Sequence, residues 1–373
     1  MHNLALELKQ GGLEVLAGFA EEWRELLERG SGGDPYARPE WIIAYLRAYS
    51  PRARVVALSA KRGGHLCALL PLTWKNGSFA GLPARKLRVP LPMPGSNTPL
   101  VLDPDVDEDT TLRALWASLR HFPGWDVLEL PSVYENAAVE RLCRIASGQG
   151  YHTGGWSLLP IPWLPLDGGD MEKLPPGATL RSRLRQAERK LAALGDLRLH
   201  VFAKADAGVL QRFYDLEASG WKGREKSAIL CDRRSRQFFN EVARESERFH
   251  YLSLYFLELS DRLISAHFGL NYRGRYYAPK IAYDEAYRQY RPGHLMVQKI
   301  LRECVPRGIS AYPMGVQEEW KLEWTKQLHQ RTFQCIFNQG AWARILFTAR
   351  FQIRPALKKL IRRPVRPEHA KFV

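Results

Sequence analysis

A short polar turn between a predicted strand and a predicted helix carries residues suited to binding chemistry. The strand is expected over Arg275–Tyr283 and the helix over Leu295–Arg307. Between them a Pro-Gly pair ending at Gly293 lets the backbone turn sharply, so unpaired N–H groups and the positive end of the helix dipole face outward. Arg288 and Arg291 could add charge-assisted contacts to a phosphate. The turn indicates a phosphate or pyrophosphate site, although an ordinary strand-to-helix connection has the same composition.

A second candidate binding element is the glycine-flanked loop from Gly220 to Arg224. Trp221 could stack on a sugar ring, while Lys222 and Arg224 could hold an anionic acceptor. The alternative is a helix ended by Gly220 with a buried tryptophan behind it. Lys321 could likewise hold a phosphate or an acceptor, or be an exposed helix lysine without a role.

Length and composition bound the class of protein. The chain has 373 residues, 45% hydrophobic and 11% aromatic, which predicts a globular protein of two domains. Its five cysteines are far apart and form no CxxC pair, which argues against a disulfide framework or a zinc ribbon and suits a reducing cytoplasm. Neither a signal peptide nor a run of transmembrane length is recognisable. We expect a cytoplasmic protein, and no metal dependence.

The net charge of +16 is concentrated in two places. Residues 341–373 contain nine Lys or Arg and one Glu, and the predicted helix Thr179–Leu194 is also basic. A nucleic acid, another polyanion or an anionic bilayer could be the partner, and a merely solubilising surface is the alternative.

The basic tail also carries an apolar stripe. A helix over residues 342–360, kinked at Pro355, would align its apolar side chains and place most arginines and lysines on the other side. Such a helix could lie on an anionic membrane and bring the protein to the inner membrane face, or it could pack on the preceding domain. The expected stripe comprises Trp342, Ile345, Leu346, Ala349, Ile353, Leu357 and Leu360.

The order of predicted elements is mixed α/β. We expect an N-terminal domain (1–166), a connector with a basic helix (167–195), a second domain (196–340) and the basic tail (341–373). The second domain begins with a strand and two helices. An antiparallel meander over 251–283 follows, and then the turn, the helix after it and a last strand at 308–314.

This order, with three local motifs, resembles the CelD-like acetyltransferases. The motifs are Glu217 to Arg224, Ala282 to Glu285 with Arg291 to Leu295, and Gly315 with Lys321 and Trp324. The CelD-like proteins are GNAT-family enzymes related to the Fem aminoacyltransferases and associated with bacterial polysaccharide biosynthesis. The resemblance spans roughly residues 36–339. It implies two GNAT-like acyltransferase domains, the first degenerate, and an acyltransferase that uses acetyl-CoA or another acyl-CoA as co-substrate.

The resemblance also implies where the acyl donor binds. A pantetheine arm would pair with the edge of the strand that ends at Tyr283, and the pyrophosphate would lie at the turn. The family's loop pattern is altered here at Tyr290 and Leu295, which keeps an aminoacyl-tRNA donor open as an alternative. The donor residues implied are Ile281, Ala282, Tyr283, Arg288, Arg291, Pro292, Gly293, His294 and Leu295.

Acyl transfer from a thioester requires a base for the acceptor and an acid for the thiolate. Asp284, His267 and Glu217 are candidate bases, and Tyr283 is a candidate acid. Each has a structural alternative. Asp284 could be a helix cap, and His267 could be a core histidine. Glu217 could face solvent on its helix, and Tyr283 could serve only in packing.

The expected reaction is direct N- or O-acyl transfer, because no cysteine or serine has an activating context. The resemblance implies that the acceptor is a sugar or a lipid-linked precursor of the cell surface. The alternatives are an aminoacyl-tRNA-dependent transferase, with tRNA as the nucleic-acid partner, and a non-catalytic peripheral-membrane protein on the same fold.

Overall fold

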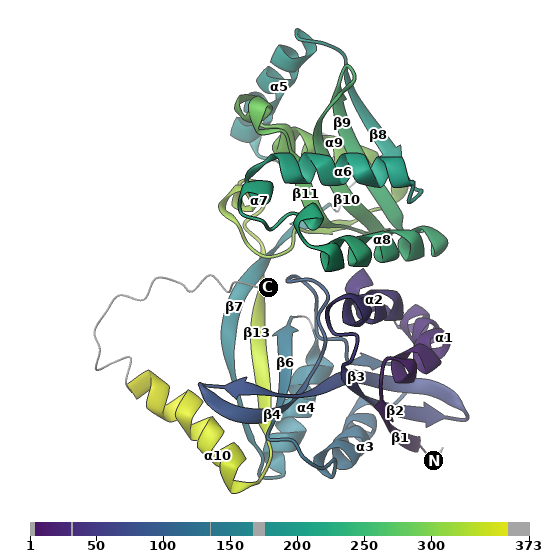
Figure 1. Ribbon diagram of the computed structural model, residues 1–373, viewed down its shortest axis with the longest axis vertical. Coiled ribbons are helices and arrows are strands. Elements are labelled where there is room, and N and C mark those ends of the chain that lie inside the picture. Colours follow the sequence, from purple (N-terminus) through teal and green to yellow (C-terminus); the bar gives the residue numbers. More distant parts are fainter. Residues whose placement is uncertain (1–3, 31–32, 135, 167–175, 357–373) are drawn as a thin grey trace. The chain divides into compact units, whose positions relative to one another are not determined.

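The computed structural model describes residues 4–30, 33–134, 136–166 and 176–356 (Figure 1). The chain forms two compact units. Unit 1 comprises residues 1–158 with 330–373, and unit 2 comprises residues 159–329. The chain passes from unit 1 to unit 2 within strand β7 (His152–Pro165) and returns within strand β13 (Leu328–Phe337). Residues 167–175 of the predicted connector and 357–373 of the predicted tail lie outside the described residues.

Unit 1 is built on a mixed sheet in the order β1-β2-β3-β4-β6-β13, with β5 beside β3. Most of its strand pairs are antiparallel, but β4 and β6 run parallel. The strands are β1 (Leu4–Gly11), β2 (Arg54–Arg62), β3 (His65–Phe79), β4 (Leu82–Arg88), β5 (Val101–Leu102) and β6 (Val127–Val133). The helical elements are α1 (Glu14–Arg29), η1 (Pro35–Ala37), α2 (Pro39–Tyr49), α3 (Glu108–Arg120), α4 (Ala137–Gly148), α10 (Ala341–Thr348) and η6 (Ala349–Ile353).

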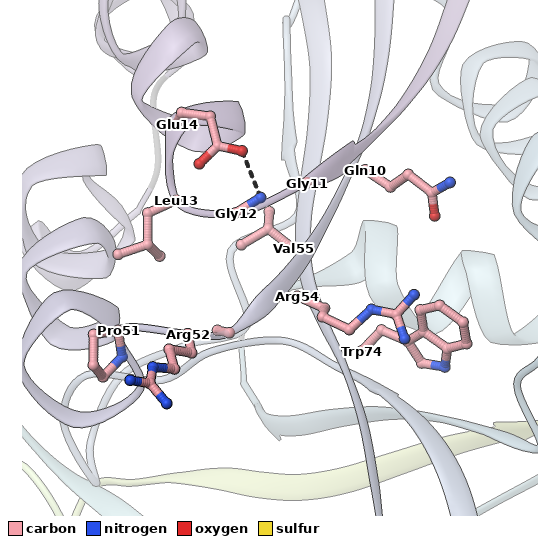
Figure 2. A pocket seen from close by; sticks show the side chains of 11 residues that line it. Gln10, Gly11, Gly12, Leu13, Glu14, Pro51, Arg52, Arg54, Val55 and Trp74 are labelled. Carbon is pink, nitrogen blue, oxygen red and sulfur yellow. Dashed lines mark hydrogen bonds between the residues drawn. The ribbon is translucent and has the colours of Figure 1, made fainter.

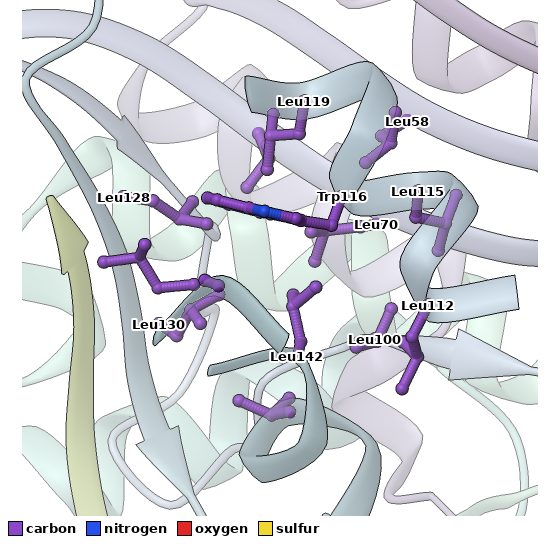
Figure 3. Packing of buried hydrophobic residues seen from close by; sticks show 14 of the residues in the cluster. Leu58, Leu70, Leu100, Leu112, Leu115, Trp116, Leu119, Leu128, Leu130 and Leu142 are labelled. Carbon is purple, nitrogen blue, oxygen red and sulfur yellow. The ribbon is translucent and has the colours of Figure 1, made fainter. Parts of the chain in front are cut away.

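Helices cover both faces of this sheet because β2 is apolar on both sides. Val56 and Leu58 pack in one core cluster with α3 and α4, whereas Val55 and Ala57 pack in another with α1 and α2. This is the alternation of successive strand residues. On the α3 side Trp116 lies fully buried among leucines of the helix and the sheet (Figure 3).

Unit 2 contains a sheet in the order β7-β12-β11-β10-β9-β8. Strands β8 to β11 pair antiparallel, and β12 pairs parallel with β11. The strands are β8 (Leu197–Phe202), β9 (Leu252–Leu259), β10 (Arg262–Tyr272), β11 (Arg275–Tyr283) and β12 (Ala311–Pro313). The helical elements are α5 (Ala178–Ala192), α6 (Ala207–Ser219), α7 (Trp221–Arg224), η2 (Ile229–Cys231), α8 (Arg233–Arg248), η3 (Glu285–Tyr290), α9 (Pro292–Cys304), η4 (Val305–Arg307) and η5 (Glu319–Glu323).

Two helical layers enclose the sheet of unit 2. From α6 and α8, Phe213 and Phe239 each pack edge-on against Phe268 of β10. Leu184 of α5 and Leu295 of α9 belong to the other core cluster. The mixed α/β fold predicted from the sequence is confirmed. The basic helix expected in the connector is α5, and its leucines are part of this core.

Candidate active site

The sheet of unit 2 opens along strand β11. β11 and β12 run parallel, but their ladder consists of one register pair, Arg275 with Ala311. β12 ends at Pro313, whereas β11 continues to Tyr283. The rest of β11 therefore presents an edge on the β12 side, which is where the sequence places the donor strand.

The backbone at this edge points outward. Tyr283 is opposite Ser265 and Ile281 is opposite His267, and the Asp284 N–H donates to the Ile264 carbonyl at 2.9 Å. In an antiparallel ladder, this pattern directs the N–H and C=O of Tyr283 and Ile281 away from β10. Such groups can pair with an extended ligand chain.

Ala282, which the sequence also suggested for the donor site, faces the other way. Its carbonyl accepts a hydrogen bond from Ser265 Oγ at 3.1 Å, and its side chain is buried. Ala282 therefore contributes to the sheet, and the outward groups belong to the residues on either side of it.

The predicted pyrophosphate turn lies at the start of α9. Arg291 adopts a left-handed conformation (φ 52°, ψ 50°) and precedes Pro292, and no side chain caps the helix. The N–H groups of Gly293 and His294 lie in the first turn, where a helix leaves its donors without internal partners. A Cβ atom on Gly293 would meet only a Tyr283 ring carbon, at 4.0 Å, so the space beside this helix end is open.

The other residues of the turn have different surroundings. Trp324 Nε1 donates to His294 Nδ1 at 3.0 Å, and burial lowers the pKa of His294, so its ring is neutral. Arg291 pairs with Glu323 at 3.4 Å, and Arg288 is exposed. Leu295 is fully buried in the core. The helix thus starts three residues before the predicted start, and Leu295 supports the turn from behind.

A buried ionic cluster lies beside the open edge. Glu217 of α6 is 2% exposed, and its Oε1 lies 3.2 Å from Lys222 Nζ and 3.3 Å from Lys280 Nζ. Its Oε2 accepts from the Ile229 N–H at 2.9 Å. Glu217 is therefore not a solvent-facing helix residue. Lys280 was not predicted from the sequence, although a lysine in the middle of a strand that is aromatic and apolar apart from its first residue, Arg275, was an available signal.

Lys222 connects this cluster to the strand edge. Its Nζ donates to the outward carbonyl of Ile281 at 2.7 Å. Burial lowers the pKa of Lys222, and the Glu217 carboxylate acts in the opposite direction. Two lysines against one carboxylate leave an excess positive charge near Ile281. Such a charge can stabilise an oxyanion or give a proton to a leaving group.

The remaining acid–base candidates have structural partners. His267 is buried, its Nδ1 lies 3.0 Å from Tyr276 Oη, and burial lowers the pKa of His267 to about 3. Asp284 accepts from the Ala286 N–H at 2.9 Å as the cap of η3 and from Arg262 at 2.7 Å. Tyr283 is partly exposed beside Gly293. Their roles in catalysis stay predictions.

The glycine-flanked loop forms the short helix α7 and is tied to the donor turn. Trp221 is 45% exposed, and its N–H donates to Glu285 Oε1 at 2.8 Å. Arg224 donates to Glu285 Oε2 at 2.9 Å. A Cβ on Gly223 would overlap the Ala218 carbonyl, so only glycine fits there. The alternative of a buried tryptophan is wrong, and the exposed ring is available to a ligand.

Comparison with known proteins agrees with this geometry. Residues 178–322 match the family described as acetyltransferase (GNAT) domain. The chain carries a GNAT acyltransferase domain. Unit 2 contains all of the matched residues, including the open edge of β11 and the start of α9.

Solved structures similar to this chain share its fold at low sequence identity. FemX is 13% identical, with a TM-score of 0.59 over 88% of this chain and 98% of that chain. A conserved protein of unknown function from Bacteroides thetaiotaomicron is 10% identical, with a TM-score of 0.56 over 89% and 100%. The C-terminal domain of a protein described as a lysylphosphatidylglycerol synthetase, from Agrobacterium fabrum, is 12% identical, with a TM-score of 0.54 over 90% and 96%. No curated protein matches the sequence.

A second ionic pair of the GNAT domain follows β12. Lys321 is buried and donates to the Val316 carbonyl at 2.6 Å and to Glu318 Oε1 at 2.9 Å. Lys321 is thus not an exposed helix lysine, and burial lowers its pKa. Burial alone would raise the pKa of the Glu318 carboxyl. The charge and the hydrogen bond of Lys321 outweigh burial, so the pKa is lowered. Glu318 also raises the pKa of Lys222, so the two pairs influence one another.

A separate cavity of about 500 Å³ lies in unit 1, outside the GNAT match, between the start of α1 and β2 (Figure 2). None of the predicted site residues lines it. The Arg54 guanidinium lies 3.9 Å from the centre of the Trp74 ring, and Glu14 accepts from the Gly12 N–H at 2.6 Å. Glu14 thereby occupies the start of α1 with a negative charge. Among the described residues, no group of three or more His, Cys, Asp or Glu could hold a metal ion.

Proposed function

We propose that the protein transfers an acyl group, most simply acetyl, from acyl-CoA to an amino or hydroxyl group. The observation that carries the proposal is the open outward edge at Ile281 beside the uncapped start of α9 at Gly293. A pantetheine arm would extend the sheet at Ile281 through main-chain hydrogen bonds. The pyrophosphate would meet the N–H groups of the first turn of α9, with Arg288 and Arg291 nearby.

The chemistry assigned to this site is direct transfer. The acceptor nitrogen or oxygen attacks the thioester carbonyl, a C–N or C–O bond forms, and the C–S bond breaks. Over the whole reaction, the proton lost by the acceptor nitrogen or oxygen is gained by the CoA thiolate, which leaves as the thiol. We assign oxyanion stabilisation to Lys222, which bonds to Ile281, and protonation of the thiolate to Tyr283, which is partly exposed.

The acceptor is a sugar or a lipid-linked saccharide precursor of the cell surface. The resemblance to the CelD-like acetyltransferases supports a polysaccharide-related acceptor in a bacterium. The exposed ring of Trp221, held beside the donor turn through Glu285, provides a stacking platform of the kind that sugars use.

The test is calorimetric binding of acetyl-CoA, longer acyl-CoAs and free CoA to the purified protein. Ile281→Pro removes an outward N–H and leaves the inter-strand ladder intact, so we expect weaker acyl-CoA binding with little loss of stability. Unchanged affinity in a folded Ile281→Pro protein would remove this edge from the donor site.

A second candidate donor is aminoacyl-tRNA. It is favoured by the fold shared with FemX and by α5, which exposes Arg183, Arg185 and Arg189. Co-purifying tRNA with a strongly salt-dependent affinity, together with no acyl-CoA binding, would establish this alternative. Binding of neither donor would favour a non-catalytic protein on an acyltransferase fold.

A further inference from the structure

The C-terminal helix of unit 1 has two apolar faces. On the inner face Ala343 and Leu346 are buried, and Phe347 packs edge-on against Phe337 at 5.5 Å between ring centres. The sequence predicted Leu346 on the same stripe as Trp342, whereas in the structure Leu346 is buried and Trp342 is exposed. The inner face therefore packs the helix on unit 1. This packing does not explain why large apolar residues lie on the outer face.

The outer face exposes three large apolar side chains within a short stretch. Trp342, Ile345 and Ile353 are 41%, 48% and 51% exposed. Few other large hydrophobic residues among the described ones are so exposed, and none of them lies on this helix. Trp342 is fixed in this position, because its Nε1 donates to the Pro83 carbonyl at 2.9 Å. The outer face is thus ordered and apolar without being covered by the rest of unit 1.

The same helix is uniformly basic. Residues 341–356 contain Arg344, Arg350 and Arg354 and no Asp or Glu. Arg344 and Arg354 are exposed, whereas the Arg350 guanidinium lies 4.2 Å from the centre of the Trp156 ring. The sequence that follows adds further lysines and arginines and a single acidic residue, Glu368. An apolar outer face flanked by cations matches the chemistry of an anionic bilayer surface.

The described length of this helix limits how it can meet a membrane. After α10 the chain forms the π-helical turn η6, and helical conformation continues over residues 354–356, which include Pro355. The kink predicted at Pro355 stays a prediction. Among the described residues, no helix is long and apolar enough to cross a bilayer. A helix of this kind binds parallel to the membrane surface.

We propose that the outer face of α10 and η6, formed by Trp342, Ile345 and Ile353 with Arg344 and Arg354, binds anionic lipid bilayers. The three apolar side chains enter the interface between headgroups and acyl chains, and the arginines contact lipid phosphates. The exposed isoleucines favour lipid over RNA, because RNA would use the arginines and the Trp342 ring but gain nothing from Ile345 and Ile353. The proposal is independent of the acyl donor.

The test is sedimentation of the full-length protein with vesicles of phosphatidylcholine containing 30% phosphatidylglycerol, against pure phosphatidylcholine. The triple variant W342S/I345S/I353S changes only exposed side chains, so we expect it to fold and its partition coefficient for the anionic vesicles to fall roughly tenfold or more. The matched control is L6S/L194S, which removes exposed apolar side chains elsewhere and should bind as wild type does.

A second variant separates charge from apolar contact. R344Q/R354Q should weaken binding to the anionic vesicles and reduce its salt dependence, while the fold is unchanged. Absence of wild-type binding to anionic vesicles, or equal binding by wild type and the triple variant, would overturn the proposal. Salt-dependent RNA binding lost in R344Q/R354Q, with no vesicle binding, would assign the surface to nucleic acid instead.

Discussion

Glu217→Gln is the substitution that probes the buried ionic cluster of the active site most sharply. The amide keeps the shape of the side chain but removes the negative charge that Lys222 and Lys280 share. Both lysines would then lie at the strand edge without the counter-charge they share, while the charge of Glu318 would still act on Lys222. The hydrogen bond from the Ile229 N–H can persist, since an amide oxygen also accepts.

The size of the effect follows from burial. Removing one partner of a fully buried ion pair costs about 3–5 kcal/mol. Here the carboxylate is buried, but the lysine side chains keep 19% and 23% exposure, so water can solvate part of the released charge. We therefore expect the free energy of unfolding to fall by about 2–3 kcal/mol. The control is Glu303→Gln, which breaks a surface pair with Arg307 and should change stability by less than about 1 kcal/mol.

The same substitution should alter the pH dependence of acyl transfer. Glu217 raises the pKa of Lys222 against the effect of burial, so Glu217→Gln lowers that pKa further. If protonated Lys222 stabilises the oxyanion, the alkaline limb of the pH profile of kcat moves to lower pH in Glu217→Gln. The assays are urea denaturation and pH–rate profiles of both variants. A Glu217→Gln protein with wild-type stability and an unmoved alkaline limb would refute the reasoning.

Three further substitutions test other parts of the GNAT domain. His267→Gln should reduce the loss of stability on acidification: the folded pKa is about 3 and the unfolded one about 6.5, so the unfolded state binds more protons in this range. Urea titrations should show that wild type loses about 2 kcal/mol more than the variant between pH 7 and pH 5, and equal losses would contradict the assignment. Gly223→Ala should raise the acceptor KM more than the acyl-CoA KM, because its Cβ meets the Ala218 carbonyl and displaces α7; an unchanged acceptor KM would show that α7 is not used. Arg224→Gln removes the side-chain contact of α7 with Glu285 but keeps the one from the Trp221 N–H, and should raise the acceptor KM, with Arg234→Gln as the surface control.

The parts of the fold that depend on local patterns were predictable from the sequence. The meander of β9, β10 and β11 was recognisable because runs rich in aromatic and other apolar residues are separated by short turns. In the second of these turns, Arg273 and Gly274 both take positive φ values of 50° and 67°. Helices α2 and α6 also follow local signals, an initial proline and an aspartate cap.

The strands at the junction of the units were not predicted. β7 contains Gly154, Gly155 and three prolines, which read as a loop. β13 is completed by pairing with β6, whose residues are about 200 positions earlier in the chain, as in the pair Gln334 with Leu130. Their strand conformation depends on partners that a local pattern cannot identify.

The candidate site was predictable only in part for the same reason. The turn at Gly293 and the loop at Trp221 stand out by composition. The cluster around Glu217 joins α6, α7 and β11, so neither the burial of Glu217 nor the contribution of Lys280 follows from spacing along the chain. Similarly, Lys321 is buried by Glu318 and Val316 through the fold of the segment after β12.

The central claim, an acyl-CoA site at the open edge of β11 and the start of α9, is tested most directly by calorimetric titration of acetyl-CoA into wild type, Gly293→Val and Gly177→Val. Both glycines have room for a side chain, and Gly177 is the matched control at the start of α5. A valine at Gly293 enters the space assigned to the phosphates. We predict that wild type and Gly177→Val bind acetyl-CoA alike, and that Gly293→Val loses about 1–3 kcal/mol of binding free energy. No binding by wild type, or equal affinity of all three proteins, would contradict the account.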